Sequence, residues 1–135
     1  MIASIFYNRL KKGMKLQSDP TIIYGIWVDT GSYKQNITKD DILHPTKYNT
    51  YTVPRLPFGP ISNPGRESLN AVMNPAKSQY LYFVSHNDGT HQFSATYEEH
   101  LKAVKSFQLD PKAREGKSWR DLKAHTTGEN QTQGK

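Results

Sequence analysis

The 135-residue chain contains no cysteine, and this absence excludes disulfide bridges and metal sites built on thiolates. It also lacks any apolar run near the roughly 18 residues that a membrane-spanning helix needs. Hydrophobic residues make up only 35% of the chain, which predicts a modest core in one domain. No P-loop, Gly-rich dinucleotide fingerprint or Ser-His-Asp order is present, so those chemistries are not indicated.

The charge balance is basic, with 18 Lys and Arg against 12 Asp and Glu and a formal net charge of +6. This balance favours acidic partners such as nucleic acid, anionic lipid or an anionic polymer. The basic residues are scattered apart from Lys11, Lys12 and Lys15, and no recognition helix, zinc finger or RNA-binding motif accompanies them. We therefore expect no nucleic-acid partner, while a glycan- or anion-binding module stays open.

Residues 48–65 hold four prolines, two glycines and two asparagines. Proline cannot continue a helix or donate to a central strand, so this segment is a loop. Its apolar content argues against a disordered linker; the apolar and aromatic residues are Tyr48, Tyr51, Val53, Leu56, Phe58 and Ile61. We predict a packed, preorganised loop that forms one wall of a binding cleft. The alternative is a surface connector with buried anchors.

Short helices are predicted on both sides of this loop. Residues 2–12 carry an apolar stripe that ends at Gly13. Asp19 is predicted as the N-cap of a second helix, with Pro20 as its first residue and Gly25 as its end. A further short helix begins at Thr38 and stops before Pro45. After the loop, residues 66–73 read as a helix whose inward side chains are Leu69, Val72 and Met73.

The second half predicts a hairpin, one helix and a tail. Residues 80–85 and 91–94 read as strands joined by the turn Asn87-Asp88-Gly89, and a capping box at Thr96 and Glu99 begins a helix. From residue 110 onward the chain is polar, which predicts a mostly disordered tail. The expected fold is therefore α+β, with short helices on a small antiparallel sheet. One domain would cover residues 1–109 and the tail residues 110–135.

Candidate chemistry is sparse at this level. Tyr24, Tyr48 and Tyr51 could stack on sugar faces or donate hydrogen bonds, although each could equally be a core aromatic. None of the acids stands out as a buried carboxyl of the kind that cleaves glycosidic bonds. His86 and His91 flank the hairpin turn, but two histidines without a carboxylate make a weak metal site, and hydrogen bonding or stacking is the favoured role.

Several strings in order carry a resemblance to a known family. They are residues 4–10 (SIFYNRL), 13–25 (GMKLQSDPTIIYG), 48–51 (YNTY), 56–61 (LPFGPI), 63–65 (NPG), 74–77 (NPAK), 80–84 (YLYFV) and 89–93 (GTHQF), followed by Thr96, Glu99 and His100. With these motifs the chain resembles the MltG (YceG-like) endolytic murein transglycosylases over residues 2–107. Phe58 departs from the pattern, because family members more usually carry a second proline there.

The resemblance implies a cell-wall enzyme that cuts nascent peptidoglycan glycan strands between N-acetylmuramic acid and N-acetylglucosamine and leaves 1,6-anhydro ends. It implies no metal and no cofactor. It also implies a place on the outer face of the cytoplasmic membrane, with the cell-wall synthesis machinery as a further partner. The matching positions that would bind substrate are Gln17, Asp19, Tyr24, Tyr48, Asn49, Tyr51 and Asn63.

The family's catalytic residue is a single glutamate in a helix just before the segment that matches residues 4–10. The resemblance therefore places the acid upstream of Met1, together with the membrane anchor, and we expect no catalytic residue among the residues of this chain. On this hypothesis the isolated chain would be inactive and would not release anhydro-muropeptides. The rival hypothesis is a non-catalytic glycan- or anion-binding module.

Overall fold

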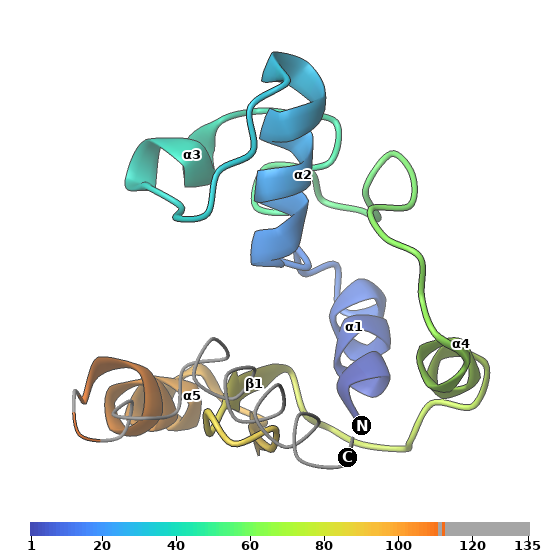
Figure 1. Ribbon diagram of the computed structural model, residues 1–135. Coiled ribbons are helices and arrows are strands. Elements are labelled where there is room, and N and C mark those ends of the chain that lie inside the picture. The colour runs from blue at the N-terminus through green and yellow to red at the C-terminus, as the bar shows by residue number, and fades with distance from the viewer. Residues whose placement is uncertain (111, 113–135) are drawn as a thin grey trace, which may run out of the picture. The chain divides into compact units, whose positions relative to one another are not determined.

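The computed structural model describes residues 1–110 and 112, and the chain divides into two units, Met1–Ser78 and Gln79–Lys135 (Figure 1). The described part contains five α-helices and one two-stranded antiparallel sheet, which confirms the predicted α+β class. Among these residues no helix combines the length and the apolar character that crossing a membrane requires. The tail predicted from residue 110 lies almost wholly outside the described residues and stays a prediction, as does the boundary at residue 109.

The first unit begins with α1 (Ile2–Lys11), which forms where the apolar stripe predicts a helix. Gly13 follows with φ +67°, a left-handed conformation that glycine adopts without steric cost. Inside the helix, Ile5 is completely buried, and the Arg9 guanidinium donates a hydrogen bond of 2.8 Å to the Leu16 carbonyl. Arg9 therefore holds the connection that leads from α1 into the next helix.

The second helix, α2 (Asp19–Thr30), is longer than the sequence predicts. Gly25 does not end it; the left-handed residue at its end is Gly31, with φ +73°. Gly25 instead sits inside the helix where a Cβ would meet the side chain of Thr46. The glycine therefore serves close packing of a distant segment against the helix. Asp19 is also not the N-cap, because the helix begins at Asp19 itself and Ser18 precedes it.

The third helix, α3 (Lys39–Leu43), begins after Thr38 as predicted, and the structure adds a capping box between Thr38 and Asp41. The Lys34 ammonium donates a hydrogen bond of 2.7 Å to Asp41, and the backbone N–H of Thr38 donates another of 2.9 Å. These two bonds, with a third from the Thr38 hydroxyl, lower the pKa of Asp41 to about 2. The helix start is thus held by a carboxylate that stays ionised at neutral pH.

The fourth helix, α4 (Arg66–Met73), has the predicted bounds but not the predicted burial. Leu69, Val72 and Met73 are 54%, 49% and 79% exposed, so the expectation that they point inward is wrong. The Tyr7 hydroxyl of α1 donates a hydrogen bond of 3.1 Å to the Val72 carbonyl, which ties α4 to α1. An apolar pattern indicates which face prefers burial, but it cannot show that a neighbouring element covers that face.

In the second unit β1 (Tyr82–Ser85) pairs antiparallel with β2 (His91–Ser94), with Phe83 opposite Phe93. The first strand starts two residues later than predicted. The connecting loop contains Asn87 and Gly89, both with positive φ, as the turn signal requires. Helix α5 (Tyr97–Val104) packs against both strands and continues into a π-helical turn over Lys105–Leu109.

The start of α5 is held by the predicted capping box. The Thr96 hydroxyl accepts from the Glu99 backbone N–H at 3.3 Å, and the Glu99 carboxylate accepts from the Thr96 N–H at 3.4 Å. Replacing Thr96 by alanine removes one acceptor, so we expect the second unit to lose about 1 kcal/mol of unfolding free energy, measured in urea. Thr96→Ser keeps the hydroxyl and should unfold like the unaltered chain. Equal losses in both variants would contradict the capping role.

Candidate functional site

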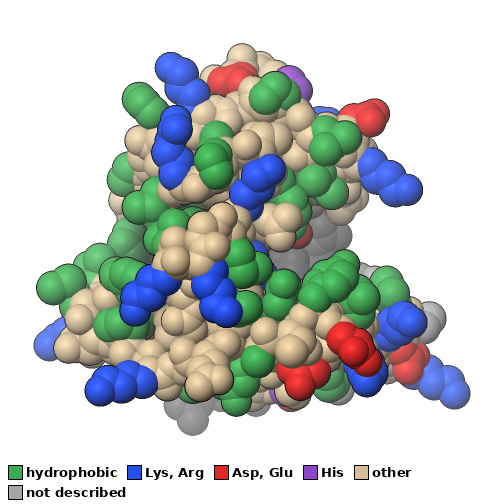
Figure 2. All heavy atoms as spheres, turned by 180° about the vertical axis from the view of Figure 1, so that it is seen from behind, with side chains coloured by type: hydrophobic (Ala, Val, Ile, Leu, Met, Phe, Trp, Pro, Cys, Tyr) green, Lys and Arg blue, Asp and Glu red, His purple; other side chains and the backbone are tan. Residues whose placement is uncertain are grey.

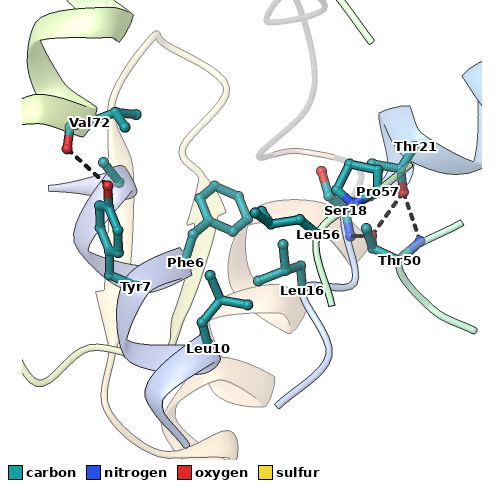
Figure 3. A pocket seen from close by; sticks show the side chains of 11 residues that line it. Phe6, Tyr7, Leu10, Leu16, Ser18, Thr21, Thr50, Leu56, Pro57 and Val72 are labelled. Atoms are coloured by element: carbon teal, nitrogen blue, oxygen red, sulfur yellow. Dashed lines mark hydrogen bonds between the residues drawn. The ribbon is translucent and has the colours of Figure 1, made fainter. Parts of the chain in front are cut away.

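Two threonine hydroxyls join the start of α2 to the segment that follows α3. Thr21 and Thr50 are 4% and 0% exposed, and their hydroxyl oxygens lie 2.8 Å apart. The Thr50 hydroxyl also accepts from the Ser18 backbone N–H at 2.9 Å, and the Thr50 N–H donates to the Thr21 hydroxyl at 3.1 Å (Figure 3). This network positions residues 48–51, which the sequence selects as part of the site, against the helix that carries Asp19 and Tyr24.

Asn49 shapes the turn that leads into this segment. Its side chain is completely buried, and its amide donates to the carbonyls of Ile42 and His44 at 3.0 and 2.8 Å. Its side-chain oxygen accepts from the Tyr51 backbone N–H at 2.9 Å. All three contacts are internal, so Asn49 is placed to hold the neighbouring residues in position and not to touch a ligand.

Tyr51 and Asp19 form the polar pair of the site. The Tyr51 hydroxyl donates a hydrogen bond of 2.6 Å to the Asp19 carboxylate, which is itself exposed. Burial, together with this bond and the charge of Asp19, raises the pKa of the Tyr51 hydroxyl well above its ordinary value. The hydroxyl thus stays protonated and fixes the carboxylate, whose remaining lone pairs can accept hydrogen bonds from a ligand.

Gln17 lies beside this pair in a strained backbone conformation. Its φ is +49°, a left-handed value that is uncommon for a residue other than glycine. The Gln17 backbone N–H donates to the Thr50 carbonyl at 3.2 Å, which holds the conformation. Its side chain is exposed and can both donate and accept hydrogen bonds. Strain of this kind is often found at functional positions.

Tyr24 and Tyr48 meet edge to face, with ring centroids 4.8 Å apart. Both rings are partly exposed, so they are neither core residues nor isolated surface residues. The structure therefore links Gln17, Asp19 and Tyr51 through one hydrogen-bonded segment and joins Tyr24 to Tyr48 through ring contact. Asn63 is exposed, and no hydrogen bond from its side chain is found among the described residues. It is not brought into this group.

An apolar groove of about 370 Å³ lies next to the threonine network (Figure 3). One side is formed by α1 through Phe6, Tyr7 and Leu10, and another by Leu56 and Pro57 of the Pro-rich loop. The loop thus contributes a wall to a groove, although this groove offers almost no polar group to orient a ligand.

Two of the carboxyl groups are poorly suited to act as a general acid, and the histidines do not form a metal site among the described residues. Hydrogen bonds from Thr90 lower the pKa of Asp88, as those from Lys34 and Thr38 lower that of Asp41, which is opposite to what a general acid needs. His86 is 2.7 Å from the Thr90 hydroxyl and contacts the Phe107 ring. No group of three or more metal-binding side chains is present in the part of the chain that the structure describes.

Lys and Arg side chains are spread over the face that Figure 2 shows and do not gather into one basic patch. An electrostatic surface for nucleic acid would concentrate them in a stripe or cluster. The chemistry that this part of the molecule offers is instead hydrogen bonding from Gln17, Asp19 and Tyr51 beside aromatic rings. Such an arrangement suits a neutral ligand that carries many hydroxyl groups and apolar faces.

Sequence reasoning missed the residues that hold this site together, namely Thr21, Thr50, Thr46 and Arg9. The threonine pair joins positions 29 residues apart, so no local pattern reveals it. The motif of residues 48–51 contains Thr50, and the Thr50 hydroxyl anchors this motif to the start of α2.

Comparison with known proteins identifies the family to which this fold belongs. The model of the YceG-like family matches residues 1–106, and the chain belongs to this family. It is homologous to endolytic murein transglycosylases: one from Bacillus subtilis is 42% identical over 106 residues, which cover 78% of this chain and 28% of the relative. One from Streptococcus pneumoniae is 34% identical over 110 residues, covering 77% of this chain and 19% of the relative.

A solved structure gives the same result for the fold. A yceG-like protein from Listeria monocytogenes superposes with a TM-score of 0.69 at 48% identity, covering 76% of this chain and 33% of that chain. The family resemblance seen in the motifs is therefore confirmed. The chain spans about a fifth to a third of the length of these relatives.

Proposed function

We propose that this chain forms part of the glycan-binding wall of an endolytic murein transglycosylase and contacts the glycan strands of peptidoglycan. The observation that carries the proposal is the exposed Asp19 carboxylate, held by the Tyr51 hydroxyl at 2.6 Å. The hydroxyl and amide N–H groups of amino sugars can donate hydrogen bonds to such a carboxylate. Gln17 lies next to the pair, and Tyr24 and Tyr48 supply aromatic rings for the apolar faces of the sugars. Asn49 holds the neighbouring segment in position through its hydrogen bonds, and a substrate contact of Asn63 stays a prediction.

The proposed reaction of the whole enzyme cleaves the bond between N-acetylmuramic acid and N-acetylglucosamine. The C6 hydroxyl oxygen of the muramic residue attacks its own C1 while the bond from C1 to the leaving oxygen breaks. An acid gives its proton to the leaving oxygen and, as the conjugate base, takes the proton of the C6 hydroxyl. The products are a 1,6-anhydro end and a free hydroxyl, and water is not consumed. The Bacillus subtilis and Streptococcus pneumoniae relatives are named endolytic murein transglycosylases, and this name supports the proposed reaction.

The described residues are proposed to bind and orient the glycan and not to supply the acid. Asp41 and Asp88 have lowered pKa values, and Asp19 is engaged as an acceptor of the Tyr51 hydrogen bond. The acid would come from another part of the whole protein. Because nascent glycan strands lie outside the cytoplasmic membrane, the enzyme is proposed to act on that outer face, beside the cell-wall synthesis machinery.

The proposal predicts that the chain co-sediments with insoluble peptidoglycan and that Asp19→Asn weakens this binding. Losing the carboxylate removes a charged acceptor, and we expect an affinity about tenfold lower, equivalent to roughly 1.4 kcal/mol. The matched control is Asp29→Asn, since Asp29 is an exposed acid near the other end of the same helix. Its binding should equal that of the unaltered chain.

Salt separates the proposal from a simple anion-binding module. Contacts to neutral sugars should persist from low to moderate salt, whereas binding driven only by the basic charge should fall steeply. Binding that disappears at moderate salt, or that is unaffected by Asp19→Asn, would contradict the proposed role. Absence of binding at both salt concentrations would remove it entirely.

A further inference from the structure

Four aromatic rings of the first unit form a continuous series of edge-to-face contacts, here called the aromatic row. It runs from Trp27 through Tyr24 and Tyr48 to Phe58. The ring centroids are 5.8 Å apart for Trp27 and Tyr24, 4.8 Å for Tyr24 and Tyr48, and 6.1 Å for Tyr48 and Phe58. The interplanar angles are 78°, 67° and 85°, so successive rings are close to perpendicular. The row therefore extends beyond the two tyrosines of the candidate site at both ends.

The aromatic side chains at the two ends of the row are exposed to solvent and not buried in the core. Trp27 is 48% exposed and Phe58 is 70% exposed. Large aromatic side chains lose favourable burial energy when they stay in water, and exposed groups of them commonly mark binding surfaces. The inner rings, Tyr24 and Tyr48, are partly buried and support the outer ones.

Phe58 is held on the row by two contacts with Lys47. The Phe58 backbone N–H donates to the Lys47 carbonyl at 3.1 Å, and the Lys47 ammonium lies 5.1 Å from the centroid of the Phe58 ring. The ring thus has a defined position although it belongs to the Pro-rich loop. Trp27 is fixed differently, because it lies one turn after Tyr24 on the same face of α2.

We propose that the aromatic row binds consecutive amino-sugar rings of a glycan strand, with Trp27 and Phe58 as the outer stacking positions. This inference rests on the proposed function and deepens it, since it extends the contact surface beyond Asp19 and Tyr51. A sugar ring has an apolar face of C–H groups that packs on an aromatic face, and polar edges that hydroxyl groups such as those of Tyr24 and Tyr48 can bond. Because successive rings of the row are nearly perpendicular, they suit a ligand made of separate rings joined by flexible linkages better than they suit a single flat ligand.

The test measures binding of the full chain to two probes, insoluble peptidoglycan and a soluble neutral oligomer of N-acetylglucosamine. Trp27→Ala and Phe58→Ala should each weaken binding about five- to tenfold, as expected for the loss of one aromatic contact. Trp27→Phe keeps a ring and should retain most of the affinity. Because both residues are exposed, both alanine variants should keep the unfolding midpoint of the unaltered chain. If one of them unfolds earlier, the other variant alone decides the binding comparison.

The matched control is Tyr33→Ala. Tyr33 is 68% exposed and belongs to the same unit, but no ring contact of Tyr33 is found in the described part of the chain. Binding should be unchanged. If Trp27→Ala and Phe58→Ala bind like the unaltered chain while Asp19→Asn is weakened, the aromatic row is excluded and the proposed function stands. Equal weakening by Tyr33→Ala would also overturn the row. If the unaltered chain binds neither probe, both proposals fail.

Discussion

Replacing Gly25 by alanine is expected to lower the free energy of unfolding by at least about 2 kcal/mol. An added Cβ would meet the Thr46 hydroxyl and lie 2.9 Å from the Thr46 Cβ. Thr46 is 6% exposed and cannot move easily, because its hydroxyl accepts from the backbone N–H groups of Tyr48 and Asn49 at 3.3 and 3.1 Å. Overpacking of this kind outweighs the gain of about 1 kcal/mol that alanine brings to a helix interior.

The sign of the change makes the measurement decisive. Without the contact to Thr46, alanine at position 25 would stabilise the chain, so urea unfolding of Gly25→Ala distinguishes the two cases directly. The matched control is Gly59→Ala, whose added Cβ would find only the Tyr48 hydroxyl at an ordinary distance of 3.9 Å. That variant should stay within about 0.5 kcal/mol of the unaltered chain. A stabilised Gly25→Ala variant would contradict the close packing.

Asn49→Asp is expected to have the other large effect, about 3 kcal/mol or more at pH 7. The new carboxylate would face the carbonyls of Ile42 and His44, to which the Asn49 amide now donates at 3.0 and 2.8 Å. An ionised group in that position has no donor to offer, and the side chain is completely buried. Unfolding in urea should show the loss as a lower midpoint with an unchanged slope.

The deficit of Asn49→Asp should depend on pH in a defined direction. Two acceptors facing the carboxyl raise its folded pKa above the unfolded value of about 3.9. Above that unfolded value the unfolded state loses its proton first, so the relative stability of the variant falls as pH rises until the folded group also ionises. The difference from the unaltered chain should thus be smallest below about pH 4. Asn63→Asp, at an exposed position of the same loop, should show neither the loss nor the pH dependence.

Capping and turn signals were predictable because their partners lie within a few residues. Thr96 and Glu99 form the capping box that their spacing indicates, and Thr38 begins α3 as predicted. The hairpin of β1 and β2 likewise follows from a turn signal between two β-forming segments. In these cases local contacts select the structure, although packing against the rest of the chain is needed to stabilise it.

The candidate site was predictable as a set of positions but not as an arrangement. The family motifs select Asp19, Tyr51 and Asn49 alike, yet the structure leaves Asp19 exposed, half-buries Tyr51 and buries Asn49 completely. Which of them can meet a ligand depends on hydrogen bonds between α2 and the segment after α3. Those bonds join residues that are distant in the sequence.

By itself, the sequence determined the family, the α+β class, the helix starts and the strings from which the candidate site is proposed. Tertiary structure alone decided that α2 continues through Gly25, that α4 leaves Leu69 and Met73 exposed, and that Thr21 binds Thr50. The physical reason is the range of the interactions. Caps and turns are satisfied within four or five residues, whereas packing against Thr46 and a hydroxyl pair 29 residues apart exist only once the chain has folded.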